Sequence, residues 1–326
     1  MFLHALGHFH PQNIIDNAFL ESLDIGTNDA WITERVGIKT RHTVLPLDYI
    51  RHTRNDDVRA ALEAAELTNA QTGARAAQMA LERAGLKPSD IGMVVAGGCS
   101  PDQCIPAEAC RIASELGVDA PALDINSACS SFCVQLHFLA GMRPERLPDF
   151  ILVVNPENST RVVNYRDRST CVLWGDASTA AVVSPRVPGR WRITETLVRG
   201  DPSGWDKVQV PRAGHFTQAG SAVQSFAIRR ATETYLALRG GRPSNEVTLI
   251  GHQANLRMLE SVQRRSEVPD GRHLYNVDTR GNCGAAGAPS VLSEKWDSEV
   301  GDTVAMSVVG SGLTWSGALL ERVRTA

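Results

Sequence analysis

Short runs of apolar and β-branched residues alternate with longer amphipathic, alanine-rich segments along the whole chain. The short runs predict strands at residues 91–98, 121–126, 150–155, 178–184, 247–252, 273–278 and 303–310. The amphipathic segments predict helices at residues 69–85, 106–117, 222–239 and 255–265 and in the run after residue 129. Capping residues and glycine stops support several of these helices. The alternation indicates an α/β protein whose strands are covered by helices.

One part of this pattern occurs twice. In each half of the chain a strand, a helix and a second strand are followed by another helix. A single offset of 153 residues superposes Cys99 on His252 and Cys129 on Asn282. The repeat predicts two fused βαβ-type halves related by a pseudo-twofold axis. Because ligands of open α/β sheets bind at the carboxyl ends of strands, we expect Cys129, His252 and Asn282 to meet at this axis.

Cys129 lies in the stretch LDINSACSSFCVQLHFL, residues 123–139, where an expected strand changes to an expected helix. A buried cysteine alone needs no functional explanation, because free cysteine packs as a small apolar residue. At the start of a helix, however, unpaired N–H groups and the helix dipole favour the thiolate. Cysteine with a histidine and an asparagine elsewhere in the chain is also a typical nucleophile set. A core histidine at 252 and a turn asparagine at 282 are the alternatives.

Composition and charge restrict the kinds of partner. The chain has 326 residues, 43% hydrophobic and 21% charged, enough for one large domain or two fused halves. A net charge of −3 and an isoelectric point near 6.3 give no overall attraction to nucleic acid or to anionic membranes. Seven cysteines, with no secretory signal and no apolar run of membrane-spanning length, predict a soluble cytoplasmic protein with reduced thiols.

Two groups of residues look like metal ligands. Cys99, Cys104 and Cys110 follow no common zinc spacing, and no fourth ligand is near in sequence. The histidines of HALGHFH, residues 4–10, alternate with apolar residues as they would in an edge strand. We therefore expect no metal site.

Seven stretches of the chain match one known family in the family's order. They are DAWITERVGIKTRH (29–42), GGCSPDQCIPAEACRIASELG (97–117), DINSACSSF (124–132), RDRSTCVLWGDASTAAVV (166–183), GHQANLRM (251–258), RGNCGAAGAPS (280–290) and VVGSGLTWSGALL (308–320). The chain thus resembles the β-ketoacyl-acyl carrier protein synthase III family of thiolase-fold condensing enzymes over nearly its whole length. The resemblance implies an α/β, thiolase-like fold with a layered αβαβα core. Its N-terminal half, residues 1–184, would carry the cysteine, and its C-terminal half, residues 185–326, the histidine and the asparagine.

The resemblance also implies a reaction. A homodimer would take an acyl group from acyl-CoA onto Cys129 and condense it with malonyl-acyl carrier protein to a β-ketoacyl thioester, in fatty-acid initiation or a related polyketide pathway. The N–H groups of Cys129 and Ser311 would hold the acyl oxyanion. His252 and Asn282 would stabilise the enolate that forms when carbon dioxide leaves. No metal and no cofactor is implied beyond the coenzyme A thioester substrates.

Other positions of the family pattern concern the grip on substrates. Trp31 and Arg168 would flank the adenine of coenzyme A, since an aromatic face and a guanidinium plane suit a flat base. Arg35 would meet its phosphates. An acidic carrier protein would meet three arginines that share one face of the helix expected at 255–265: Arg257, Arg264 and Arg265. The alternatives are a surface aromatic at 31 and a solvated charged face on the helix.

Three positions depart from the family pattern. Val309 replaces the usual phenylalanine before the glycines near the histidine, and Ile105 replaces a common aromatic that reaches the pocket across the dimer. The segment at residues 200–220 is shorter than the family's loop. These differences concern substrate choice more than thiolate chemistry.

Two other functions fit part of the pattern. A same-fold acyltransferase would pass the Cys129-bound acyl group to an alcohol, an amine or another non-malonyl acceptor, and simple transfer needs a base more than a paired donor site. The presence of both His252 and Asn282 argues against it. A non-catalytic partner subunit would be expected to lack the nucleophile, which is present.

The sequence predicts that Cys129 alone among the seven cysteines carries an acyl group. Incubation with acyl-CoA followed by peptide mapping should therefore place the adduct on the Cys129 peptide. An adduct that persists in Cys129→Ala would contradict the assignment.

Overall fold

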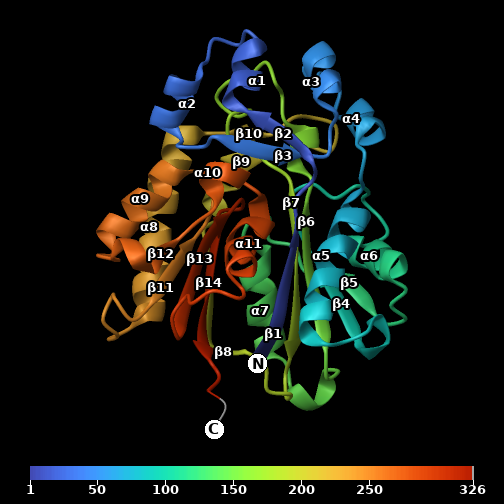
Figure 1. Cartoon of the computed structure of the whole chain (residues 1–326), viewed down its shortest axis with the longest axis vertical. Helices are drawn as coiled ribbons and strands as arrows, with labels where there is room; N and C mark the ends of the chain where they lie inside the picture. Colours follow the sequence, from blue (N-terminus) through green and yellow to red (C-terminus); the bar gives the residue numbers. More distant parts are fainter. Residues whose placement is uncertain (325–326) are drawn as a thin grey trace.

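The computed structural model describes residues 1–324, and its main element is one ten-stranded mixed sheet (Figure 1). The strands lie in the order β12-β11-β13-β14-β8-β1-β7-β6-β4-β5. One half of the sheet contains β1 (Phe2–Phe9), β4 (Met93–Ala96), β5 (Ala122–Asp124), β6 (Ile151–Glu157) and β7 (Ala177–Ser184). The other contains β8 (Trp191–Gly200), β11 (Thr248–Gly251), β12 (His273–Leu274), β13 (Thr303–Gly310) and β14 (Thr314–Arg322). Counted outward from the central β1–β8 pair, corresponding strands occupy corresponding places.

The pairing directions repeat as well. In one half β4 pairs in parallel with β5 and β6, and in the other β11 pairs in parallel with β12 and β13. The remaining pairs are antiparallel. Within the ten-stranded sheet, the two halves pair where Phe2 and Leu3 of β1 face Arg192 and Trp191 of β8. The carboxyl ends of the parallel strands in each half therefore lie on the same side of the sheet, as a βαβ-type repeat requires.

Helices form three layers with the two halves of the sheet. α5 (Asn69–Ala84) and α6 (Glu108–Leu116) pack on one half, and α8 (Gly220–Arg239) and α9 (Leu256–Arg265) on the other. α7 (Ser131–Gly141) contacts β6, β8, β13 and β14, whereas α11 (Gly287–Glu294) contacts β1, β7 and β11. These two helices thus lie between the halves, and the predicted αβαβα layering is confirmed.

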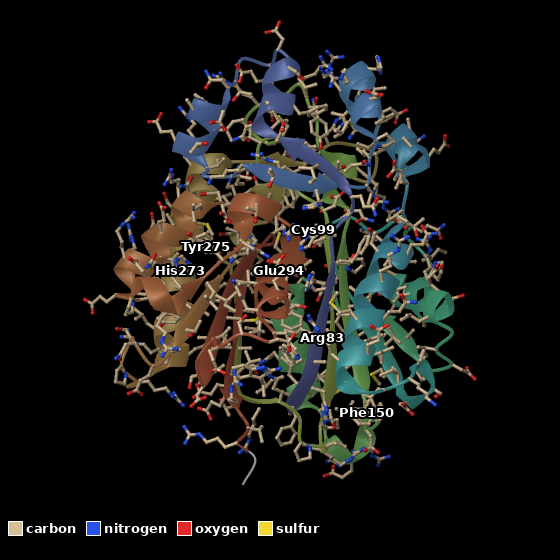
Figure 2. All side chains as sticks on the ribbon, in the orientation of Figure 1. Arg83, Cys99, Phe150, His273, Tyr275 and Glu294 are labelled. Atoms are coloured by element: carbon tan, nitrogen blue, oxygen red, sulfur yellow. The ribbon has the colours of Figure 1, made fainter. Side chains whose placement is uncertain are left out.

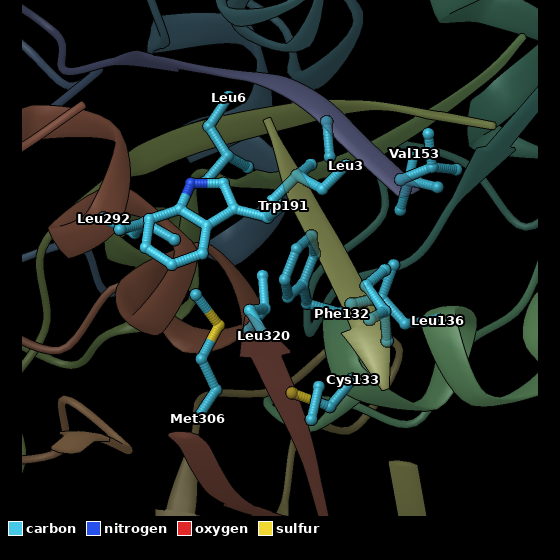
Figure 3. Close-up of a cluster of buried hydrophobic side chains, with 14 of the residues drawn as sticks. Leu3, Leu6, Phe132, Cys133, Leu136, Val153, Trp191, Leu292, Met306 and Leu320 are labelled. Carbon is cyan, nitrogen blue, oxygen red and sulfur yellow. The ribbon is translucent and has the colours of Figure 1, made fainter. Parts of the chain in front are cut away.

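The largest hydrophobic core surrounds the two central helices. Side chains from α7, α11 and strands of both halves meet there (Figure 3): Leu3, Leu6, Phe132, Cys133, Leu136, Val153, Trp191, Leu292, Met306 and Leu320. Every residue from Ser131 to Leu136 is buried. The first six residues of α7 are thus covered on all sides, which explains why this part of its sequence shows no polar face.

Smaller elements form a cap over one end of the sheet, at the top of Figure 1. They are α1 (Asn17–Ser22), α2 (Asp29–Arg35), α3 (Leu47–Thr53), α4 (Val58–Ala64), the β2 (Asn13–Asp16) and β3 (Thr40–Thr43) pair, the β9 (Val208–Gln209) and β10 (Thr217–Gln218) pair, and α10 (Val277–Arg280). Across residues 1–324, no helix has both the length and the apolar composition that crossing a bilayer requires.

Two strand predictions need correction. The strand expected at 273–278 ends at Leu274, and α10 begins at Val277, because the side-chain amide oxygen of Gln253 accepts the N–H groups of Asn276 and Val277. β1 is a central strand, not an edge strand. Its histidines alternate with apolar residues because they find polar partners, such as the Ser293 hydroxyl 2.8 Å from Nδ1 of His8.

The contact of β1 with α5 gives a stability prediction. A Cβ atom on Gly7 would lie 2.0 Å from the backbone oxygen of Ala76 and 2.6 Å from the nitrogen of Ala80. Gly7→Ala should lower the free energy of unfolding by at least about 1–3 kcal/mol, the usual cost of overpacking. Urea unfolding measures the change. Gly141→Ala is the control, since nothing lies within 4 Å of its added Cβ, and an equal effect of both variants would contradict the packing argument.

Candidate active site

The strand ends of the two halves open into one pocket. Cys129 follows β5, His252 follows β11 directly, and Asn282 comes after β12 and α10. All three residues line a cavity of about 560 Å³. The structure therefore brings together the residues that the 153-residue offset paired.

A tight turn presents Cys129 at the start of α7. Ala128 has a φ of 47°, which is uncommon for a residue other than glycine. The turn is held by hydrogen bonds from the Ser130 N–H to the Ser127 carbonyl (3.1 Å) and from the Ser131 N–H to the Ala128 carbonyl (3.0 Å). Strained backbone of this kind persists where surrounding structure fixes it. The sequence predicted the strand-to-helix junction at Cys129 but not the left-handed backbone of Ala128.

The turn at residues 310–312 packs directly on the turn at residues 127–131 that contains Cys129. A Cβ on Gly310 would lie 2.8–2.9 Å from the Ser130 hydroxyl and nitrogen and from the Ser127 carbonyl. Only glycine permits this approach, which places Ser311 in the pocket wall with Cys129. The Ser311 hydroxyl donates to the Val208 carbonyl at 2.5 Å and so ties the turn to β9.

The sulfur of Cys129 has polar neighbours from both halves. The sulfur of Cys99 lies 3.4 Å from it. This hydrogen bond does most to hold the pKa of the Cys129 thiol well below its usual value, while burial acts in the opposite direction and the nearby His252 adds a smaller lowering influence. The largest lowering influence is thus Cys99, for which the sequence predicted a place in the repeat but no role beside Cys129.

The amide of Asn282 has a fixed orientation. Its oxygen accepts the N–H of Gly284 at 3.1 Å, so the other end of the amide must be the nitrogen. The backbone of Asn282 pairs with Leu173 and Gly175 on either side of Trp174. Asn282 therefore offers an N–H donor from a rigid segment.

Glu157 is a buried residue of the site that sequence reasoning missed. Its carboxylate accepts the N–H of Cys99 at 3.0 Å and that of Ala285 at 2.8 Å, and so joins the loops that precede α6 and α11. Burial raises the pKa of this carboxyl to about 7. The sequence offered only a charged residue two positions after the strand expected at 150–155.

The predicted coenzyme A residues lie together in the pocket wall. Trp31, Arg35 and Arg168 all line the cavity, and both guanidinium groups lie 4.9 Å from the Trp31 ring centre. Arg168 also donates to the carbonyl of Gly26. A base that stacks between Trp31 and Arg168 therefore requires the guanidinium to move off the ring.

The three arginines of α9 differ in their surroundings. Arg257 is tied to the end of α2, because it donates to the carbonyls of Glu34 (3.1 Å) and Thr33 (2.8 Å). Arg264 and Arg265 are exposed in the last turn. Arg257 thus has a structural contact that the sequence did not predict, and the other two are free to meet a partner.

The positions that depart from the family pattern lie in different surroundings. Val309 is buried in the pocket wall, whereas Ile105 is 84% exposed and does not line the pocket of its own chain. The segment at 200–220 contributes β9 and β10, and Val208, Phe216 and Gln218 of this segment line the cavity.

One group of side chains within residues 1–324 has ligand atoms close enough for a metal ion. Atoms of His8, His10 and Glu294 lie within 4.8 Å of one another. Arg280 donates to the same Glu294 oxygen that His10 contacts, at 2.8 Å. A guanidinium at this oxygen opposes a second cation, so the donor set fits a metal poorly.

Comparison with known proteins gives one consistent result. Residues 123–202 match the model of the family described as 3-oxoacyl-[acyl-carrier-protein (ACP)] synthase III, and residues 238–322 match the model of its C-terminal region. A β-ketoacyl-[acyl-carrier-protein] synthase III of Coxiella burnetii is 30% identical, with 98% of each chain covered. One of Campylobacter curvus is 28% identical, covering 97% of this chain and 95% of the relative.

Solved structures agree with the sequence matches. The 3-oxoacyl-[acyl-carrier-protein] synthase III of Aquifex aeolicus superposes with a TM-score of 0.86 at 28% identity, covering 98% of this chain and 99% of that one. The priming β-ketosynthase of the R1128 polyketide pathway gives 0.83 at 26% identity, covering 98% and 96%. The thiolase-like fold inferred from the sequence is confirmed by these structures.

The thiols of the site and the core should differ in reactivity at pH 7. The lowered pKa of Cys129 increases its thiolate fraction, whereas burial raises the pKa of Cys133 and of Cys171 to about 12. Iodoacetamide should label Cys129 faster in the folded than in the urea-unfolded protein. It should label Cys133 and Cys171 at least tenfold more slowly in the folded than in the unfolded protein, by about the factor that a pKa shift of this size implies. Peptide mapping of both samples measures each rate. Equal protection of all three cysteines would contradict the electrostatic argument.

Proposed function

The chain belongs to the β-ketoacyl-[acyl-carrier-protein] synthase III family, and on this premise we propose that it loads an acyl group from acyl-CoA onto Cys129 and condenses it with malonyl-acyl carrier protein. It is an enzyme of the acyltransferase class. The proposal depends chiefly on one observation: a cysteine with a lowered pKa shares its pocket with both His252 and Asn282. A thiolate suffices for acyl transfer, whereas a pair of donors beside it suits an enolate.

In the acylation step, the Cys129 thiolate attacks the acyl thioester and the thiolate of coenzyme A leaves. Negative charge develops on the acyl oxygen, which the N–H groups of Cys129 and Ser311 would receive. The glycine contact between the two turns supports this pairing, since it fixes the distance between them.

In the condensation step, the malonyl group loses carbon dioxide and its electron pair becomes an enolate. His252 and the Asn282 amide nitrogen would donate to the enolate oxygen. The enolate carbon then attacks the acyl carbonyl on Cys129, and the thiolate is released as the carbon–carbon bond forms. The two substrates and these side chains balance every atom and electron, so the proposal includes no cofactor.

Substrate binding follows from the pocket wall. We assign Trp31 and Arg168 to the base of coenzyme A and Arg35 to its phosphates. Arg264 and Arg265 would dock the acidic carrier protein, with Arg257 holding α9 against α2.

The proposal includes a homodimer and a cytoplasmic location. β5 is an edge strand with Leu123 exposed, and Ile105 is exposed near the start of α6. An exposed apolar sheet edge favours pairing with another chain, which would bring Ile105 to the partner's pocket. Seven free cysteines suit a reducing compartment, which supports the cytoplasmic location.

The repeat of strand order supports a division of the chain into two halves between residues 184 and 185.

Asn282→Ala separates the two steps. The variant should still form the acyl-enzyme at Cys129, because the backbone donors of the acylation step remain. Release of carbon dioxide from malonyl-acyl carrier protein should fall about a hundredfold or more, the usual effect of losing one preorganised donor. Single-turnover acylation and carbon dioxide release are measured on one preparation.

The same substitution at the exposed Asn245 is the control and should change neither rate. Equal loss of both steps in Asn282→Ala would argue against the assigned role. A wild-type protein that releases no carbon dioxide, but passes its acyl group to an alcohol or amine, would replace the condensing function with acyl transfer.

Arg264→Glu tests the carrier-protein surface. The charge reversal should raise the KM for malonyl-acyl carrier protein about tenfold and leave acylation by acyl-CoA unchanged, since rim charges act mainly on encounter. Arg143→Glu is a matched control, because Arg143 is exposed beyond the far end of α7 from Cys129. An equal rise in KM for both variants would show a general charge effect instead of docking at α9.

A further inference from the structure

The contact between Cys99 and Cys129 is not explained by the steps proposed above. Cys99 comes from the loop after β4, the position that corresponds to His252 in the other half. Its sulfur lies 3.4 Å from the sulfur of Cys129, within the range of a hydrogen bond that involves sulfur. Figure 2 labels Cys99 near the centre of the molecule. Cys99 thus contacts the Cys129 sulfur, and its counterpart His252 lines the same pocket as Cys129.

The surroundings decide which sulfur keeps its proton. The Cys99 N–H lies 3.1 and 3.0 Å from the two carboxylate oxygens of Glu157, which is fully buried. When it is ionised, this carboxyl, whose pKa burial raises to about 7, disfavours a negative charge on the Cys99 sulfur. Cys129 instead has His252 beside it and the start of α7 behind it. The proton therefore belongs on Cys99 and the charge on Cys129, in agreement with the raised pKa of Cys99, whose largest cause is its hydrogen bond to Cys129.

We propose that Cys99 is a further catalytic residue, whose thiol donates an S–H···S hydrogen bond to the Cys129 thiolate and stabilises this ionised form of the nucleophile. The inference rests on the proposed role of Cys129 as nucleophile. The groups that face this pair are His252 from the loop after β11 and Glu157 from β6, and neither replaces the Cys99 donor. No atom or electron is transferred, because the hydrogen bond only shifts the position of the proton.

The hydrogen bond distinguishes the steps of the reaction. It is strong while the Cys129 sulfur is an anion, and it weakens once the sulfur belongs to a thioester, a poor acceptor. Cys99 should therefore assist acylation and the final release of the thiolate. It should have little effect on the decarboxylation that occurs while Cys129 carries the acyl group.

The test is the pH profile of iodoacetamide alkylation at Cys129, followed by peptide mapping of the full-length protein after reduction. In Cys99→Ala the midpoint of the profile should move at least one pH unit upward, so alkylation on the acidic limb should be about tenfold slower than in wild type. The rates should converge at alkaline pH, where the Cys129 thiol is ionised in the wild type and in the variant. Cys99→Ser should stay close to wild type, because its hydroxyl still donates to the thiolate.

Single-turnover kinetics provide the second readout. At pH 6, acylation by acyl-CoA should slow about tenfold in Cys99→Ala, while carbon dioxide release by the enzyme already acylated at alkaline pH should change less than about twofold. An unchanged alkylation midpoint in Cys99→Ala would overturn the proposal. An equal shift in Cys99→Ser would also overturn it, because such a shift would indicate altered packing. Thermal unfolding of both variants is the control for a folding defect.

Failure of this inference is distinguishable from failure of the proposed function. If Cys99→Ala shifts the midpoint but wild type releases no carbon dioxide from malonyl-acyl carrier protein, the hydrogen bond stands and condensation does not. If wild type condenses but the midpoint does not move in Cys99→Ala, condensation stands and the role of Cys99 does not.

Discussion

The burial of α7 between the two halves of the sheet determines where the groups of the site lie. Its apolar side chains, among them Phe132 and Leu136, pack against strands of both halves, so the helix has little freedom to slide or rotate. Cys129 stands two residues before its first turn. α11 is held in the same layer and is preceded by Asn282. The positions of nucleophile and donor are thus set by hydrophobic packing several residues away from the chemistry.

Buried polar side chains make this packing specific. The Asn155 amide donates to the Gly97 carbonyl (2.8 Å) and to Gln135 of α7 (3.1 Å), and Gln135 donates to the Ile125 carbonyl (3.1 Å). These bonds join α7 to the ends of β4, β5 and β6. Glu157 adds the link to Ala285 in the other half. These hydrogen bonds favour one arrangement, because another would leave more buried polar groups without partners.

Long periodic segments and the repeat were predictable from the sequence. The strands near residues 93, 151, 177, 248 and 303 and the helices α5 to α9 lie where hydrophobic patterning placed them, and one offset identified Cys129, His252 and Asn282 as neighbours. The cap formed by α1 to α4 was not foreseen, because its helices are of six or seven residues and each depends on packing instead of periodicity. The roles of Cys99, Glu157 and Arg257 depend on contacts across 30, 58 and 223 residues of chain. No local pattern encodes such contacts.

The mirrored order of strands also bears on how an asymmetric site can arise from a symmetric architecture. A pair of identical halves would place the same residue on both sides of the axis, so a thiol there would face a second identical thiol and an amide a second amide. Joining the halves in one chain removes this restriction, because each position can then change independently of its counterpart. In the proposed mechanism position 129 supplies the nucleophile and position 282 a donor, and positions 99 and 252 likewise carry different residues. Covalent linkage, which adds nothing to the chemistry itself, is what permits two corresponding loops to do different work on one substrate.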